Sequence, residues 1–162
     1  MGDLTFRDAT LADLPLIVQM YADDALGQIR EDLSEPLAAA YAEAFNAIDS
    51  DPRQRLIVGE QDGEVVATLQ LSFLPHVVLH GAERAQIEAV RVRSDRRGAG
   101  LGQELIGWAI EEAKARGCRL VQLTTNAERH DAQRFYRRLG FQPTHVGMKL
   151  TLPDPRAEPP PA

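Results

Sequence analysis

The sequence has little cysteine and no long apolar run. Cys118 is the only cysteine among the 162 residues, which excludes an intrachain disulfide framework. No hydrophobic stretch approaches the ~18 residues that a membrane-spanning helix needs, and residues 1–4 have neither the basic nor the apolar region of a secretory signal. With 44% hydrophobic and 26% charged residues, the composition is that of a globular domain. These features predict a cytoplasmic protein of one domain, with no membrane partner.

Acidic residues outnumber basic ones, and the net charge at pH 7 is −6. Residues 1–64 contain 14 acids and 4 bases, whereas residues 65–162 contain 10 acids and 14 bases. An acidic chain is poorly suited to non-specific nucleic-acid binding, but a basic second part can hold a small polyanion. We therefore expect no nucleic-acid partner.

Apolar periodicity predicts a mixed α/β fold. The predicted strands are residues 4–7, 56–60, 64–73, 86–92, 120–124 and 146–152, and the predicted helices are residues 11–21, 37–48, 100–116 and 131–139. The Asp62–Gly63 pair predicts a hairpin, and the strand–helix–strand unit over 87–125 predicts a parallel strand pair. Residues 153–162 contain five prolines. They are predicted to form a disordered tail after a domain over residues 1–152.

A glycine-rich turn joins the strand predicted over 86–92 to the helix predicted over 100–116. Its sequence is Arg96-Arg97-Gly98-Ala99-Gly100-Leu101-Gly102. Glycines let backbone N–H groups face outward at a helix N-terminus, where the helix dipole favours an anion. The turn thus predicts a pyrophosphate site, although such turns also occur only for tight packing. A Walker A site is excluded because no Lys-Ser or Lys-Thr follows the glycines. A dinucleotide fold is disfavoured because no acid follows at the end of the next strand.

Two motifs in this order resemble the GNAT N-acetyltransferase superfamily. Residues 97–102 match the Arg/Gln-x-x-Gly-x-Gly/Ala signature and follow a Val-x-Val strand at 90–92. Residues 132–141 look like the family's Ala-x-x-x-Tyr-x-x-x-Gly-Phe segment. The resemblance covers residues 4–152 and implies a GNAT-like α/β fold. That fold is a mixed, mostly antiparallel central sheet with helices on both faces and a splayed pair of strands.

The resemblance implies an enzyme that uses acetyl-coenzyme A as its acetyl donor. The strand at 90–92 would pair with the pantetheine arm, and the amides of the turn would bind the pyrophosphate. The cofactor-binding residues are then Val90, Arg91, Val92, Arg97, Gly98, Ala99, Gly100, Leu101, Gly102 and Asn126. Asn126 is included although the family often has its Asn at the position of Arg129. A homodimer through the C-terminal strands is common among relatives.

Transfer to an amine requires a base, because an alkyl amine with a pKa of about 10.4 arrives protonated near pH 7. Glu88 is the predicted base, on the same strand face as Val90 and Val92 if side chains alternate regularly. Its alternative roles are an exposed strand carboxylate, or an ion-pair partner for Arg91 or Arg129.

Tyr136 matches the family's general acid, which protonates the coenzyme A thiolate. A phenol with a pKa of about 10 can donate to a thiolate as charge develops. The alternative is a core tyrosine beside Phe135. Cys118 is interpreted as a small core residue, because no histidine is near it in sequence. No metal is expected, since His76 and His80 lack a metal-binding helix pattern.

The acceptor is predicted to be a primary amine on a small or amino-acid-like molecule, acetylated by direct transfer in a ternary complex. Acids near the first helix favour a cationic amine by attraction, and they equally fit a solvated surface: Asp23, Asp24, Glu31, Asp32 and Glu35. Two alternatives stay open. One is acetylation of a protein N-terminus or lysine, and the other is a non-catalytic coenzyme A-binding regulatory module.

Overall fold

The computed structural model describes residues 2–23 and 27–153, which form two compact units. The first unit ends at Thr124 and the second begins at Thr125. Residues 154–162 of the predicted tail lie outside the described residues, and both that tail and the single domain over 1–152 stay predictions.

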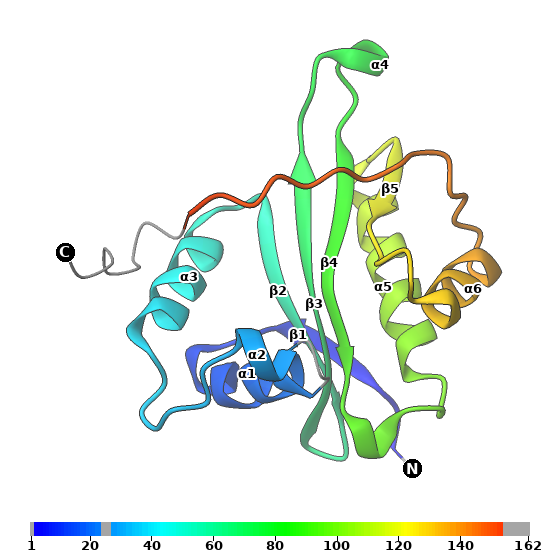
Figure 1. Cartoon of the computed structure of the whole chain (residues 1–162). Helices are drawn as coiled ribbons and strands as arrows, with labels where there is room; N and C mark the ends of the chain where they lie inside the picture. The colour runs from blue at the N-terminus through cyan, green and yellow to red at the C-terminus, as the bar shows by residue number, and fades with distance from the viewer. Residues whose placement is uncertain (1, 24–26, 154–162) are drawn as a thin grey trace. The chain divides into compact units, whose positions relative to one another are not determined.

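The first unit contains a sheet and its covering helices (Figure 1). The strands are β1 (Thr5–Asp8), β2 (Gln54–Gln61), β3 (Glu64–Leu74), β4 (Arg84–Val92) and β5 (Leu120–Leu123). The helices are α1 (Leu14–Ala22), α2 (Gly27–Arg30), α3 (Ala39–Ser50), α4 (Val78–Gly81) and α5 (Leu101–Arg116), with 3₁₀ turns η1 (Leu11–Asp13) and η2 (Ser94–Arg96). The second unit contains α6 (His130–Arg138).

The strands follow one another in the order β1-β2-β3-β4-β5. Neighbouring strands are antiparallel except β4 and β5, which are parallel. A parallel pair needs a crossover connection, and α5 supplies it between these two strands. The predicted mixed, mostly antiparallel sheet with helices on both faces is confirmed.

Alternation along the strands sends consecutive side chains to different helices. Arg55 lies over the Trp108 ring of α5, with 5.2 Å from its guanidinium carbon to the ring centroid. The next residue, Leu56, belongs to the cluster packed against α1 and α3. Since successive strand residues point to opposite faces, α5 covers one face of the sheet and α1 with α3 cover the other.

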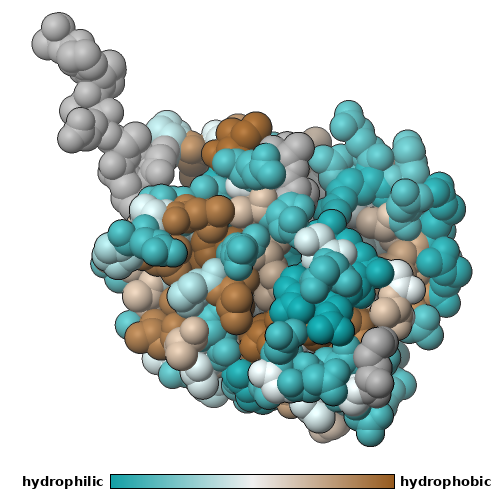
Figure 2. Space-filling view, turned by 90° about the horizontal axis from the view of Figure 1, so that it is seen from below, coloured by the Kyte–Doolittle hydropathy of each residue, from teal (hydrophilic) through white to brown (hydrophobic). Residues whose placement is uncertain are grey.

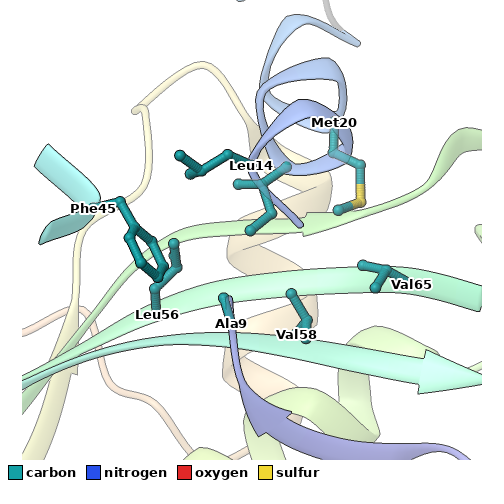
Figure 3. Packing of buried hydrophobic residues seen from close by; sticks show 8 residues of the cluster. Ala9, Leu14, Met20, Phe45, Leu56, Val58 and Val65 are labelled. Carbon is teal, nitrogen blue, oxygen red and sulfur yellow. The ribbon is translucent and has the colours of Figure 1, made fainter. Parts of the chain in front are cut away.

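Buried apolar side chains fill the space between the sheet and the helices α1 and α3 (Figure 3). Leu14 and Met20 come from α1 and Phe45 from α3, and they meet Leu56 and Val58 of β2. Each such side chain contributes about 1.5–3 kcal/mol when fully buried. This packing fixes α1 and α3 on the sheet.

The hairpin between β2 and β3 turns at Asp62 and Gly63, as predicted. Both residues have positive φ, +54° and +79°. Two consecutive residues of positive φ are the mark of a type I′ turn, whose twist suits antiparallel strands. A second hairpin joins β3 to β4 and carries α4 at its tip (Figure 1).

A glycine ends α5 as predicted, whereas α3 begins later than predicted. Gly117 ends α5 in the left-handed conformation, and its N–H donates to Lys114 O at 2.9 Å, as expected for a C-terminal glycine. In α3 the helix begins at Ala39, two residues later than predicted, although Ser34 followed by Pro36 is a typical helix start. The Ser34 hydroxyl instead donates to Pro36 O at 3.3 Å within the loop.

The last predicted strand, residues 146–152, is not a strand in the structure. Its alternating apolar side chains are between 73% and 93% exposed: Val146, Met148, Leu150 and Leu152. Alternation selects which side chains share a face, but a strand also needs a hydrogen-bonded neighbour. No such ladder is formed by residues 146–152 in the described part of the chain. The homodimer through C-terminal strands stays a prediction.

Hydrophobic residues on the face shown in Figure 2 are interspersed with hydrophilic ones. Exposed apolar side chains also occur at the tip of the β3–β4 hairpin, where Val77 is 93% exposed. Within residues 2–23 and 27–153, no helix combines the length and the hydrophobicity needed to cross a membrane.

Candidate functional site

A cavity of about 670 Å³ lies on the sheet face that α3 covers. Ala47 and Ile48 of α3 form part of its wall, and strands β2 to β5 supply most of the rest. The polar lining residues are Gln54, Gln70, Ser72, Arg84, Gln86, Glu88 and Gln122. A concave site with convergent polar groups suits a small polar ligand.

Amide and hydroxyl groups of the cavity are held by hydrogen bonds to one another. The Oε1 of Gln54 accepts from the Ser72 hydroxyl at 2.6 Å and from Gln70 Nε2 at 3.2 Å. On the neighbouring strands, Gln122 Nε2 donates to Gln86 Oε1. These bonds fix the orientation of the amides, so the floor of the cavity is ordered before any ligand binds.

Glu88, the predicted base, lies in this cavity and is exposed. It pairs across the sheet with Gln70 of β3. Within the part of the chain that the structure describes, no hydrogen bond or ion pair engages its carboxylate, so the alternative of an ion-pair partner finds no support there. The alternative of an exposed strand carboxylate agrees with its exposure. An exposed carboxylate in a polar cavity is free to accept a proton from a bound ligand.

The prediction that Glu88 shares a strand face with Val90 and Val92 is wrong. Glu88 pairs with Gln70 and Arg91 pairs with Thr68, so β4 contains one residue more than β3 over this stretch. The extra residue forms a β-bulge at Ala89, whose φ is +53°. A bulge shifts the alternation by one residue. Glu88 therefore shares its face with Arg91, and Val92 points to the other side.

Arg91 faces α1 rather than the end of the sheet. Its guanidinium carbon lies 5.8 Å from the ring centroid of Tyr21, and its Nη1 donates to Val90 O at 2.9 Å. Burial raises the pKa of Tyr21 to about 12, so this phenol stays protonated at physiological pH. The Arg91 side chain is thus committed to α1, and any pantetheine contact from this residue would come from its backbone.

Strand β4 continues beyond its pairing with β5. The parallel ladder ends at the pair of Ile87 with Leu123, whereas β4 continues to Val92. In an antiparallel pair such as β3–β4, alternate residues direct their backbone groups away from the partner strand. The stretch from Glu88 to Val92 is therefore not paired with β5, although the carbonyls of Val90 and Val92 accept from Arg91 and Arg97.

The glycine turn follows directly and places exposed backbone at the start of α5. Gly98 and Gly100 have φ of +83° and +86°, and an added Cβ would meet nothing within 4 Å at either. The amides of Gln103 and Glu104 are used within the helix, by Gly100 O. Within the turn, residues 97–100 are exposed, whereas Leu101 is buried. Open glycines at the N-terminus of a 16-residue helix fit a phosphate group.

Arginines around the turn are paired with acids. The Nη2 of Arg97 donates to Asp23 Oδ2 at 2.8 Å, and its Nε donates to Val92 O at 3.1 Å. Arg93 pairs with Glu64 at 2.9 Å and with Asp95 at 2.7 Å. The hydrogen bond from Arg93 holds the pKa of the Glu64 carboxyl below its usual range. Of these arginines, only Arg97 was predicted to bind the cofactor.

The acids near the first helix do not line the cavity. Asp23 pairs with Arg97. The Tyr41 hydroxyl donates to the Glu31 carboxylate at 2.9 Å, and the oxygen of that hydroxyl accepts from the Asp32 N–H at 2.8 Å. Asp24 lies outside the described residues. The hypothesis that these acids attract a cationic amine acceptor therefore stays a prediction.

Arg84 is a cavity residue that sequence reasoning missed. Its side chain lines the cavity, and its Nε atom is buried without a hydrogen-bond partner in the described structure. The signal was available in the alternation of Arg84, Gln86 and Glu88, three polar residues separated by the buried Ala85 and Ile87. Such a polar face opposite an apolar one marks a strand that borders a site rather than a core.

Tyr136 and Asn126 belong to the second unit. The Tyr136 ring contacts Phe135 and Phe141 edge to face, with centroids 5.1 and 5.8 Å apart. Asn126 Oδ1 accepts from the Glu128 N–H at 2.9 Å and so shapes the turn before α6. Their roles in catalysis and cofactor binding stay predictions.

Nucleophilic catalysis by a cysteine and metal binding find little support in the described residues. Burial, with the nearby Glu83 carboxylate, raises the pKa of the Cys118 thiol, which disfavours the nucleophilic thiolate. In residues 2–23 and 27–153, no three His, Cys, Asp or Glu side chains gather into a metal-binding group.

Comparisons with known proteins identify the class as an acyltransferase of the GNAT fold. The family described as "Acetyltransferase (GNAT) family" matches residues 18–141. An aminoalkylphosphonate N-acetyltransferase of Salmonella typhimurium is 36% identical over 114 residues, which cover 70% of this chain and 73% of that protein. An L-methionine sulfoximine/L-methionine sulfone acetyltransferase of Pseudomonas aeruginosa is 32% identical over 154 residues, covering 90% and 87%.

A solved structure described as a transcriptional regulator from Bacillus halodurans C-125 is also similar. It has a TM-score of 0.90 and 47% sequence identity, and the match covers 93% of this chain and 100% of that one. The chain belongs to the GNAT family of acetyltransferases, which confirms the resemblance seen in its two motifs.

Proposed function

We propose that this enzyme transfers the acetyl group of acetyl-coenzyme A to the primary amine of a small or amino-acid-like molecule, directly and within a ternary complex. The observation that carries the proposal is the layout of β4. Glu88 lies in the polar cavity, and the same strand runs past the end of β5 into the open glycine turn. One strand thus borders a site for an amine and an edge suited to a thioester arm.

The residues of the turn fit the donor. Backbone groups of Val90, Arg91 and Val92 would hold the pantetheine arm, and the amides from Gly98 to Gly102 would hold the pyrophosphate with the helix dipole of α5. Arg97 is 51% exposed beside them and can exchange its acidic partner for a phosphate. Asn126 is a further proposed contact. Bound acetyl-coenzyme A supplies the electrophilic thioester carbonyl.

Glu88 is the proposed base for the amine. The ammonium form of the acceptor gives its proton to the carboxylate, directly or through water, and the nitrogen lone pair attacks the carbonyl carbon. An N–H near Val92 would stabilise the developing oxyanion. The nitrogen loses its second proton to water as the carbon–sulfur bond breaks. Tyr136 would give a proton to the departing thiolate and regain one from solvent. The assignment of Tyr136 rests on its match to the family motif.

The named relatives support a small acceptor. Their names give an aminoalkylphosphonate and L-methionine sulfoximine as the molecules that they acetylate. A cavity of about 670 Å³ accommodates molecules of that size. Acetylation of a protein N-terminus or lysine is the alternative substrate class, and it predicts activity on peptides.

A regulatory module that binds coenzyme A without turnover is the alternative from another class. The similar structure from Bacillus halodurans is described as a transcriptional regulator. Release of free thiol separates the two functions. We expect acetyl-coenzyme A and a panel of small primary amines to release coenzyme A thiol and to yield the acetylated amine by mass spectrometry. Binding of acetyl-coenzyme A without thiol release on any amine or peptide would support the module instead.

A further inference from the structure

We propose that Arg84 binds an anionic group of the acceptor, so that the preferred acceptors are amines that also carry a carboxylate or a phosphoryl group. The inference rests on the proposed acetyl transfer and narrows its substrate class. It starts from a positively charged side chain in the cavity that the protein itself leaves without an anionic partner.

The environment of Arg84 lacks a compensating acid. Its Nε is buried without a hydrogen-bond partner, and no ion pair of its guanidinium occurs in the described part of the chain. The nearby Glu83 instead pairs with Arg116, at 2.7 Å. A buried polar group without a partner is costly. A ligand that accepts a hydrogen bond from the Arg84 guanidinium supplies the missing interaction and is bound more tightly.

Chemistry favours an oxyanion as this partner. A guanidinium has only donors, arranged in a planar fork that matches the two oxygens of a carboxylate or phosphoryl group. The other polar groups of the cavity are neutral amides and the Ser72 hydroxyl, apart from the carboxylate of Glu88. The cavity therefore contains one cationic and one anionic side chain among neutral hydrogen-bonding groups.

The two charges have defined places along β4. Arg84 and Glu88 line the same cavity and lie four residues apart on one strand, a Cα separation of about 13 Å at the usual rise. Gln86 lies between them. An acceptor with a positive amine at one end and an anion at the other can place its amine toward Glu88 and its anion toward Arg84. This arrangement orients the nucleophile as well as selecting it.

The test compares acceptors that differ only in the anion. The pairs are β-alanine with β-alaninamide, and phosphoethanolamine with ethanolamine. In the wild-type enzyme we expect kcat/KM to be at least about 10-fold higher for the anionic member of one pair, and which pair responds separates carboxylate from phosphoryl recognition. Arg84→Gln should raise KM for that anionic acceptor by about 10- to 100-fold, with no change for its neutral counterpart.

Controls separate binding of the anion from general damage. Arg119→Gln removes the same charge at an exposed site outside the cavity and should leave every KM unchanged. Arg84→Lys should restore part of the anionic preference, because it keeps the charge but not the fork. Thermal unfolding of each variant reports whether it folds. Equal losses for anionic and neutral acceptors in a folded Arg84→Gln enzyme would overturn the proposal.

A binding experiment keeps the two proposals distinguishable. Calorimetry of phosphoethanolamine and β-alanine, in the presence of coenzyme A, measures acceptor binding without turnover. Binding that Arg84→Gln abolishes, without any thiol release, would contradict the proposed acetyl transfer but support the anion site. Thiol release from neutral and anionic amines with equal kcat/KM would support the transfer and overturn the anion site.

Discussion

The guanidinium of Arg97 joins Asp23, at the end of α1, to Val92, at the end of β4. It donates to the Asp23 carboxylate at 2.8 Å and to the Val92 carbonyl at 3.1 Å. A side chain that the family motif assigns to the cofactor is thus held by an acid of its own chain. A phosphate group of acetyl-coenzyme A would compete with that acid.

This competition predicts opposite effects for the two partners. Asp23→Asn should tighten acetyl-coenzyme A binding by about 2- to 5-fold, because an exposed ion pair of ~0.5–1 kcal/mol no longer has to be broken. Arg97→Gln should weaken binding by about 10-fold. Isothermal titration calorimetry measures both values. Weaker binding in Asp23→Asn would show that the acid positions Arg97 rather than competing for it.

The glycine turn should be sensitive to substitution for a functional reason beyond strain. Gly98→Ala places a side chain at a φ of +83°, with free space around it, and should cost about 1–2 kcal/mol of stability. Gly63→Ala has the same kind of strain at +79°, in the β2–β3 hairpin. Both variants should lose similar stability in thermal unfolding, but only Gly98→Ala should bind acetyl-coenzyme A more weakly. Equal affinity in the two would remove the turn from the cofactor site.

Replacing the proposed base should lower turnover. Glu88→Gln keeps the size of the side chain but removes its capacity to take a proton, and we expect kcat to fall by about 100-fold. The dissociation constant of acetyl-coenzyme A should stay within about 2-fold. Glu43→Gln, on the exposed side of α3, is the matched control. A Glu88→Gln enzyme with wild-type kcat would exclude the base role.

The proposed acid predicts a second kinetic effect. Tyr136→Phe removes the phenolic proton and keeps the ring that contacts Phe135 and Phe141. We expect kcat to fall by about 10- to 100-fold with acetyl-coenzyme A binding nearly intact, as followed by thiol release and calorimetry. Unchanged turnover would assign Tyr136 to packing alone.

Acid should weaken the fold through Asp13. Its side chain is 10% exposed and accepts from Arg7 at 2.8 Å and from the Thr10 N–H at 2.7 Å, and the hydrogen bond from Arg7 lowers the pKa of Asp13 to about 2. The pKa in the folded state is below that in the unfolded state. The stabilisation of about 2 kcal/mol is therefore present above pH 4 and is lost as the pH falls toward 2.

Denaturant titrations at pH 7, pH 4 and pH 2 check this pH dependence. Asp13→Asn should be less stable than the wild type at pH 7, with a smaller further loss between pH 4 and pH 2. Asp3→Asn, on an exposed side chain, should behave as the wild type. A similar acid dependence in Asp13→Asn and the wild type would place the acid sensitivity elsewhere.

Local patterns predicted most of the first unit because its elements carry strong signals. The Asp62–Gly63 turn and the glycine at the end of α5 follow from backbone conformations that few residues adopt. The prediction of a strand over 146–152 was wrong because alternating apolar residues do not show whether a neighbouring strand is available for hydrogen bonding. The polar face of the strand that contains Arg84 is visible in the sequence, but the absence of an acidic partner for its guanidinium is visible only in the folded chain.

The bulge at Ala89 also bears on the proposed reaction through the shape of β4. Glu88 pairs with Gln70 and Arg91 pairs with Thr68, so the extra residue is accommodated between two anchored pairs. A bulge of this kind bends its strand and increases the local twist. Deleting Ala89 would restore a regular ladder and keep both pairs in place. Any loss of turnover in that variant would therefore measure the contribution of the bend itself, separately from the register of the strand.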